Sequence, residues 1–251
     1  GNFVSKDAFG YSLTYFENDY QARHQGTNQS NWISNSLPTN LQVTSDSGLY
    51  NGNIKRMITS VRGIEEEIMP TQINLYTYDQ LNRIFDMTTF KGLEGNGDFD
   101  SVASYRSSYS YDKNGNLMTL KRDAPKLMHP DNPASEFIEK MDIFKYNYVA
   151  NTNKLSHIND EVDATKFSED IDNQSVGNYQ YDQIGQLIFD DAEKIEKIEW
   201  RVDGKVKSVQ KNNSEFFVNF FYDGLGNRVA KQVTNGRRGT TTTHYTRDAQ
   251  G

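Results

Sequence analysis

Apolar and polar residues alternate over short stretches of this chain, and turns of one recurring kind separate the stretches. From Gln72 to Tyr78, alternate positions place Ile73 and Leu75 on one face of a half-buried strand. Comparable stretches predict strands at residues 11–16, 54–61, 143–148 and 155–162. The stretch that begins at Ser135 is expected to open with a helical turn. The pattern therefore predicts an all-β fold.

The turns share a motif in which an aromatic residue and an aspartate precede a glycine or an asparagine. The clearest copy runs from Tyr222 to Val229 and reads YDGLGNRV. Because internal repeats fix the architecture of a chain, the other copies matter. Three further copies are clear, and they begin at Tyr78-Asp79, at Tyr111-Asp112 (with Gly115) and at Tyr181-Asp182 (with Gly185). Three eroded copies begin at Trp200 (with Gly204), Tyr148 and Tyr50.

Each position of the motif has a mechanical role. In the clearest copy, Tyr222 ends a strand, and Asp223 caps the turn by bonding the backbone two residues on. Two ordinary residues bend the chain in a type I turn, and Gly226 takes the left-handed conformation that most side chains avoid. Val229 then resumes the sheet. We expect each copy to be the tip of a β-hairpin that contains a bulge.

The spacing of the copies predicts a strip of hairpins with loop insertions. Tyr181, Trp200, Tyr222 and Tyr245 lie 19, 22 and 23 residues apart, which leaves room for two strands and two turns. Earlier copies lie 33 to 37 residues apart and need extra loops, which repeat arrays collect at one edge. The expected insertions cover residues 20–38, 91–103, 123–135 and 163–177, and three prolines exclude a central strand from the third.

Composition limits the possible partners. The chain has 251 residues and a net charge of −7, which argues against nucleic acid or an anionic membrane surface. It has no cysteine for disulfides or thiolate chemistry, and no run of eighteen apolar residues that would insert into a membrane. Its 15 tyrosines and 14 phenylalanines, within a hydrophobic content of 35%, are typical of repeated sheets with much solvent-facing surface.

Several side chains could carry chemistry, and each has a simpler interpretation. The motif aspartates Asp79, Asp112, Asp182 and Asp223 are interpreted as turn caps rather than acid catalysts. The four histidines (24, 129, 157 and 244) have no paired zinc-ligand spacing, and no G-x-S-x-G sequence marks a nucleophile. The alternate oxygen-bearing residues Glu94, Asn96, Asp98 and Asp100 could wrap calcium, but a plain loop is favoured. We therefore expect no catalytic residue, no cofactor and no metal.

The aromatic residues also have two interpretations. Exposed tyrosine rings on a flat sheet could stack against sugars. Because the motif tyrosines end their strands at neighbouring tips, mutual stacking between copies is the favoured interpretation. The phenylalanines of one stretch are expected to be core-strand residues: Phe216, Phe217, Phe220 and Phe221.

With these motifs, the chain resembles the RHS (YD) repeat proteins from about residue 9 to its end, particularly those of the Bacteroidetes type. The resemblance rests on the YD-x-x-G-N tips, the segment Ile198–Val209, the segment Tyr222–Lys231 and the segment from Thr242 onwards. It implies a β-sheet strip of hairpins that spirals as a solenoid or as part of a shell wall. In Tc toxins, polymorphic RHS toxins and teneurins, such a shell encloses a carboxy-terminal toxin domain or serves cell-surface contacts. Nothing here matches the self-cleaving aspartyl segment of cargo-releasing members.

The expected function is structural. The chain would be a wall segment of a longer, secreted or surface-exposed bacterial protein, whose partner is a cargo domain of the same chain or a secretion or surface protein. An alternative is an adhesion module that recognises glycan or protein through loops 20–38, 93–100 and 123–134. A hydrolase formed by the loops is a third hypothesis.

Overall fold

The computed structural model of the chain describes residues 8–17, 19, 41–44, 47–61, 71–92, 99–124, 127–129, 132–137, 139–167, 170–211, 215–236 and 238–246. Regular structure within these ranges consists of seventeen β-strands, so the predicted all-β fold is confirmed. No helix in the described part of the chain is long and apolar enough to cross a membrane.

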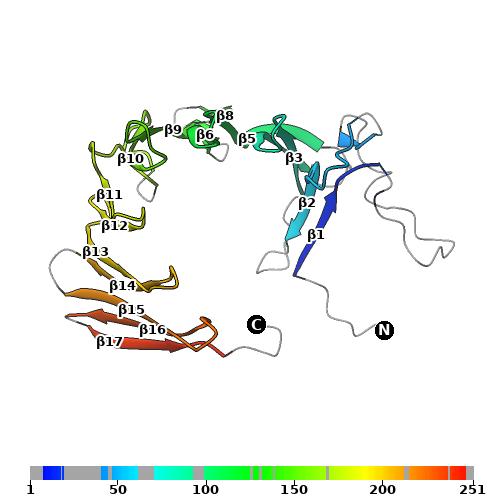
Figure 1. The fold of residues 1–251 in the computed structure, drawn as a ribbon. Coiled ribbons are helices and arrows are strands. Elements are labelled where there is room, and N and C mark those ends of the chain that lie inside the picture. The colour runs from blue at the N-terminus through cyan, green and yellow to red at the C-terminus, as the bar shows by residue number, and fades with distance from the viewer. Residues whose placement is uncertain are drawn as a thin grey trace. The chain divides into compact units, whose positions relative to one another are not determined.

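The strands form two antiparallel sheets and one separate hairpin (Figure 1). The first sheet has the order β1-β2-β3-β4-β5-β6-β9-β10, and the second runs from β11 to β17 in chain order. Strands β7 and β8 pair only with each other. The chain also divides into two compact units, Gly1–Ile143 and Phe144–Gly251, and the division falls inside β9 (Lys140–Tyr148).

The first unit contains the early hairpins. Its strands before β9 are β1 (Phe9–Thr14), β2 (Arg56–Val61), β3 (Gln72–Tyr78), β4 (Ile84–Gly92), β5 (Phe99–Tyr111), β6 (Leu117–Asp123), β7 (Leu127–His129) and β8 (Asn132–Phe137). The strand predicted from Gln72 to Tyr78 is confirmed with both boundaries.

A small apolar cluster lies on one face of the first unit. Ile73 is fully buried there with Leu41, Ile58 and Phe90, and Leu75 packs against the cluster as the alternation predicted. The guanidinium of Arg56 is buried beside it and donates to the Leu41 carbonyl at 2.6 Å. This bond partly compensates for removing the charge from water, a removal that lowers the pKa of Arg56.

The second unit continues the meander with shorter connections. After the later residues of β9 its strands are β10 (Leu155–Asp160), β11 (Tyr179–Tyr181), β12 (Leu187–Asp190), β13 (Ile195–Trp200), β14 (Val206–Lys211), β15 (Phe216–Tyr222), β16 (Arg228–Asn235) and β17 (Gly239–His244). Its seven-stranded sheet buries little: Ile198 and Ala230 are the buried apolar side chains among its described strand residues. This thin apolar layer agrees with the low aliphatic content of the chain.

The four phenylalanines of β15 correct one prediction. They were expected in the core, but Phe216, Phe217 and Phe220 are half-buried and Phe221 is 47% exposed. The reason is architectural: each face of this sheet is only partly covered, so a strand rich in aromatic residues remains accessible on both sides.

The predicted insertions are partly correct. The segment 163–177 has no described strand, and residues 20–38 lie outside the described part. The insertion at 91–103 is too wide, because Lys91 pairs with Asp100 and Gly92 with Phe99 in the β4–β5 ladder. The excursion at 123–135 leaves the main sheet as predicted, but it folds as the β7–β8 hairpin. The helical turn expected from Ser135 is wrong, because Ser135 lies in β8.

Candidate functional site

The recurring feature of both units is the row of motif turns, which we call the tips and name by their aromatic residue. At the Tyr222 tip, one carboxylate oxygen of Asp223 accepts the backbone N–H of Leu225 at 2.9 Å and of Asn227 at 2.8 Å. Asp79, Asp112 and Asp182 accept the corresponding pairs at 2.8 to 3.0 Å. The predicted capping role is confirmed, and each carboxylate also reaches the residue four positions on.

The left-handed position of each tip is also confirmed. Gly226 has a φ of +80° and donates to the Asp223 carbonyl at 3.1 Å, which closes the turn. Asn82 occupies the same position in the Tyr78 tip with a φ of +63°. Glycine occupies it in three other copies (Gly115, Gly185 and Gly204), and Asn151 has a φ of +61° in the eroded Tyr148 copy. Glycine and asparagine tolerate this conformation better than other residues.

The predicted bulge follows the same register at each of these tips. The aromatic residue pairs with the residue six positions later, and the register shifts at that pair: Tyr78 with Ile84, Tyr111 with Leu117, Tyr181 with Leu187, Trp200 with Val206 and Tyr222 with Arg228. One detail differs from the prediction. The sheet resumes at Arg228, one residue before Val229, so an arginine stands where the other copies carry an apolar residue.

At three of the tips, the internal hydrogen bonds stabilise the charged form of the aspartate. The backbone and side-chain bonds from Asn227 lower the pKa of Asp223. The side chain of Asn116 has the largest effect at Asp112, and that of Arg83 at Asp79, again lowering each pKa. These carboxylates are therefore ionised hydrogen-bond acceptors at neutral pH, which suits a cap and does not suit a proton donor.

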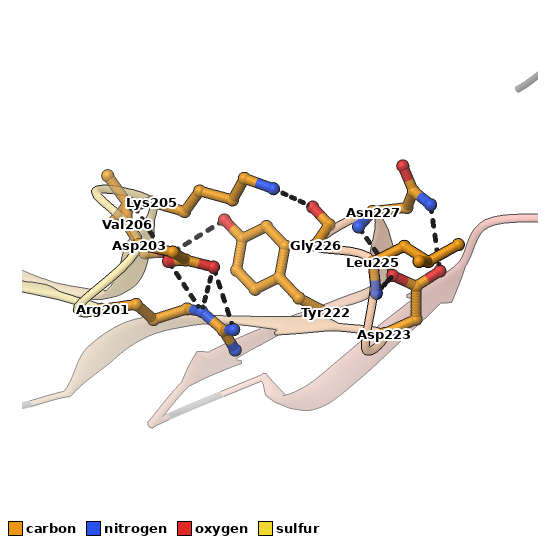
Figure 2. Close-up of polar contacts among 9 residues, drawn as sticks. All are labelled: Arg201, Asp203, Lys205, Val206, Tyr222, Asp223, Leu225, Gly226 and Asn227. Atoms are coloured by element: carbon orange, nitrogen blue, oxygen red, sulfur yellow. Dashed lines mark hydrogen bonds and ion pairs between the residues drawn. The ribbon is translucent and has the colours of Figure 1, made fainter.

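The aromatic residue of each tip is bonded to the tip before it. The Tyr222 hydroxyl donates to the Val206 carbonyl at 2.8 Å (Figure 2). The same bond joins Tyr78 to Ile54, Tyr111 to Ile84 and Tyr181 to Leu155 at 2.8 to 3.0 Å, and the Trp200 indole N–H donates to Leu187 at 2.7 Å. Ile84, Leu155, Leu187 and Val206 each open the return strand of the preceding hairpin, and Ile54 lies two residues before β2. We call these contacts the inter-tip hydrogen bonds.

A cation reinforces alternate inter-tip hydrogen bonds. Arg83 lies 4.6 Å from the centre of the Tyr111 ring and donates to the Asp112 carbonyl at 3.1 Å. Lys154 lies 5.7 Å from the Tyr181 ring centre, and Lys205 lies 5.7 Å from that of Tyr222. Lys205 also donates to the Gly226 carbonyl, and Arg201 lies on the other side of the Tyr222 ring (Figure 2).

These contacts correct the expectation of mutual stacking. Among the described residues, no ring-to-ring contact joins Tyr78, Tyr111, Tyr181 or Tyr222 to one another. Consecutive tips are separated by the two strands of a hairpin, so each hydroxyl reaches a neighbouring carbonyl. At Tyr111, Tyr181 and Tyr222 the ring face lies next to a cation. Burial raises the pKa of Tyr78, Tyr111 and Tyr181, which keeps those hydroxyls protonated as donors.

The residue just before each return strand was missed by the sequence analysis. At this position, cations occupy alternate copies (Arg83, Lys154, Lys205) and amides occupy the others (Asn116, Gln186, Asn227). The Asn116 and Asn227 amides bond the aspartate of their own tip, whereas the cations reach the next tip. The alternation of cations and amides is visible when the motif copies are aligned. That the cations contact the next tip follows only from the distance between tips in the structure.

Other candidate sites remain apart from the tips. Residues Glu94 to Asp98 of the possible calcium loop lie outside the described residues, as does His24. His157 lies within hydrogen-bond distance of Ser156, at 3.1 Å, and His244 lies in the exposed strand β17. Of the adhesion loops, residues 20–38 and 93–98 are outside the described part.

Neither a protein-family model nor a curated protein sequence matches the chain. Among solved structures, it is similar to the TcdB2-TccC3-Cdc42 complex, with 12% identity, 77% of this chain covered and a TM-score of 0.35. It is also similar to the Photorhabdus luminescens Tc holotoxin pore, with 12% identity, 79% of this chain covered and a TM-score of 0.36. A third similar structure is TcdB2-TccC3 without its hypervariable C-terminal region, with 12% identity, 77% of this chain covered and a TM-score of 0.36. The chain spans 12% to 13% of these three chains, and similarities of this size do not by themselves establish a shared fold.

Proposed function

We propose that this chain is a wall segment of a secreted or surface-exposed bacterial protein, and that the wall encloses or presents a carboxy-terminal, toxin-like domain. The inter-tip hydrogen bonds carry the proposal. They recur at the same motif position and join consecutive hairpins in series at Tyr78, Tyr111, Tyr181, Trp200 and Tyr222.

The physical argument concerns stiffness. Turns between strands are ordinarily the most mobile parts of a sheet, because few contacts hold them. The Tyr78 tip, for example, is fixed internally by Asp79 and externally by the hydroxyl of Tyr111, the next aromatic residue of the motif series. A sheet whose turns are bonded to one another resists bending along that edge, which is what a thin enclosing wall needs.

The motif chemistry supports a structural role over catalysis. The aspartates are ionised acceptors, the tyrosine hydroxyls are donors to carbonyl groups, and the tip cations lie over rings. Each group has a bonding role in the wall. We therefore propose that the tips perform no catalysis and hold no cofactor, and that the partner is a cargo domain of the same longer chain or a secretion or surface protein. The resemblance to RHS repeats supports this assignment.

Electron microscopy of the protein expressed from its complete gene tests the proposal. We expect a hollow shell, together with protection of the carboxy-terminal domain from protease until the shell is denatured. A matched sample in which that domain is cut away should retain the shell. A compact solid particle would contradict the wall function. If protease cleaved the carboxy-terminal domain while the sheet remained intact, adhesion would be favoured instead.

A further inference from the structure

A pocket of about 540 Å³ opens between the Trp200 and Tyr222 tips of the second unit. It lies where the β13–β14 and β15–β16 hairpins adjoin, and its volume suits a small ligand. Its side-chain lining consists of Trp200, Lys205, Val206, Tyr222, Arg228 and Tyr245. We infer that this pocket binds a carboxylated sugar, a function separate from that of a wall.

Arg228 is the first reason. It stands at the position where the other tips carry an apolar residue, and its guanidinium lies 4.2 Å from the centre of the Phe220 ring. Its Nε atom is buried and has no hydrogen-bond partner within the described ranges. No described carboxylate lies within ion-pair distance of it, whereas Arg83 and Arg201 are each paired with an aspartate.

The second reason is that the lining is cationic. Lys205 adds an ammonium group that donates to the Gly226 carbonyl, and the lining residues include no acid. The nearby carboxylate of Asp203 is already bonded to Arg201 at 3.0 Å. In a protein with a net charge of −7, two cations and no acid among the lining residues favour an anionic ligand. The planar guanidinium matches a carboxylate in particular.

The third reason is the aromatic part of the lining. The rings of Trp200, Tyr222 and Tyr245 contribute to one pocket, and Tyr245 is 37% exposed. Two cations alone would bind phosphate or any other small anion. Because Arg201 and Lys205 already lie over the Tyr222 ring, the apolar surface comes from Trp200 and Tyr245. These rings add a preference for a ligand with a C–H face, and a pyranose that carries a carboxylate combines both features.

Calorimetric titration of the 251-residue chain with D-glucuronic acid tests the inference, with D-glucose, acetate and inorganic phosphate as comparison ligands. We expect glucuronate to bind at least about tenfold more tightly than any of the three, because only glucuronate satisfies both the cations and the rings. Equal binding of acetate or phosphate would overturn the sugar assignment. The absence of glucuronate binding would overturn the inference as a whole.

Two leucine variants separate the pocket from general charge effects. Arg228→Leu places an apolar residue where the other tips have one, so the fold should be retained while glucuronate affinity falls at least about tenfold. Arg238→Leu removes an exposed cation that is not part of the lining and should leave the affinity unchanged. Unchanged affinity in a folded Arg228→Leu protein, or an equal loss in both variants, would refute the site.

Discussion

The hydroxyl of Tyr222 donates a 2.8 Å hydrogen bond to the backbone carbonyl of Val206, across the gap between two consecutive hairpin tips. The donor is the last residue of β15, and the acceptor is the first residue of β14. A residue that only ends a strand would need the aromatic ring alone, whereas this bond uses the tyrosine hydroxyl to join two tips. A phenylalanine would fill the same space without joining the tips.

Replacing that hydroxyl gives the first prediction. Tyr222→Phe should lower the free energy of unfolding by about 0.5–1.5 kcal/mol, since it removes one hydrogen bond and retains the ring. Urea unfolding of the chain measures the loss. Tyr245→Phe is the matched control, because no described residue bonds the Tyr245 hydroxyl, and it should leave stability unchanged. Equal effects in the two variants would show that the inter-tip hydrogen bond does not stabilise the sheet.

The left-handed glycine gives the second prediction. Gly226→Val should destabilise the chain by about 1 kcal/mol or more, because a β-branched residue is strained at its φ of +80°. The new side chain would also displace Lys205 from the Gly226 carbonyl. The control is the same substitution two residues earlier, Gly224→Val: a Cβ atom added at Gly224 has no neighbouring atom within 4 Å, and its backbone is not left-handed. Thermal unfolding should separate the two variants, and coincident melting temperatures would contradict the tip geometry.

The local structure of the tips could be predicted from the sequence because it depends on residues close together in the chain. The cap of Asp223, the left-handed Gly226 and the bulge at Tyr222 all follow from positions within one motif copy. The alternation of Ile73 and Leu75 likewise identified the buried face of β3. These features have strong local causes that tertiary contacts did not override.

The relations between tips could not be predicted in the same way. Whether Tyr222 stacks on another ring or donates to Val206 depends on the distance between hairpins, which no single motif encodes. The accessibility of Phe221 depends on what covers the sheet, and its hydrophobicity alone suggested burial. Ser135 lies in β8 because Leu127–His129 supplies a pairing partner, which outweighs a local preference for a helical turn.

The depressed pKa of Asp223 gives a prediction about acid stability. Hydrogen bonds from Asn227 hold this pKa below the ordinary value of 3.8, so the stabilisation is present above that value and is lost as pH falls through the folded pKa. The melting temperature should therefore decline from about pH 5 to about pH 2, and Asp223→Asn should make the decline shallower. Asp172→Asn removes an exposed carboxylate that accepts no hydrogen bond from a described residue, and it should follow the wild-type curve. Parallel curves for wild type and Asp223→Asn would contradict the capping argument.

Arg83 allows the contribution of a tip cation to be measured in the first unit. Its guanidinium pairs with Asp79 at 2.6 Å, donates to the Asp112 carbonyl at 3.1 Å and lies 4.6 Å from the Tyr111 ring centre. Arg83→Met removes all three contacts and retains much of the side-chain volume, so it should cost about 1–2 kcal/mol in urea unfolding.

Arg83→Lys separates charge from geometry, because an ammonium cannot bond the carboxylate and the neighbouring carbonyl with the planar fork of a guanidinium. The free energy of unfolding of Arg83→Lys should lie between those of the wild type and Arg83→Met. Arg106 provides the control: its side chain is 56% exposed and makes a 3.3 Å ion pair with Asp86, so Arg106→Met should cost less than about 0.5 kcal/mol. If Arg83→Met were as mild as Arg106→Met, the cation would be an ordinary surface charge. The inter-tip hydrogen bonds would then join the hairpins without its help.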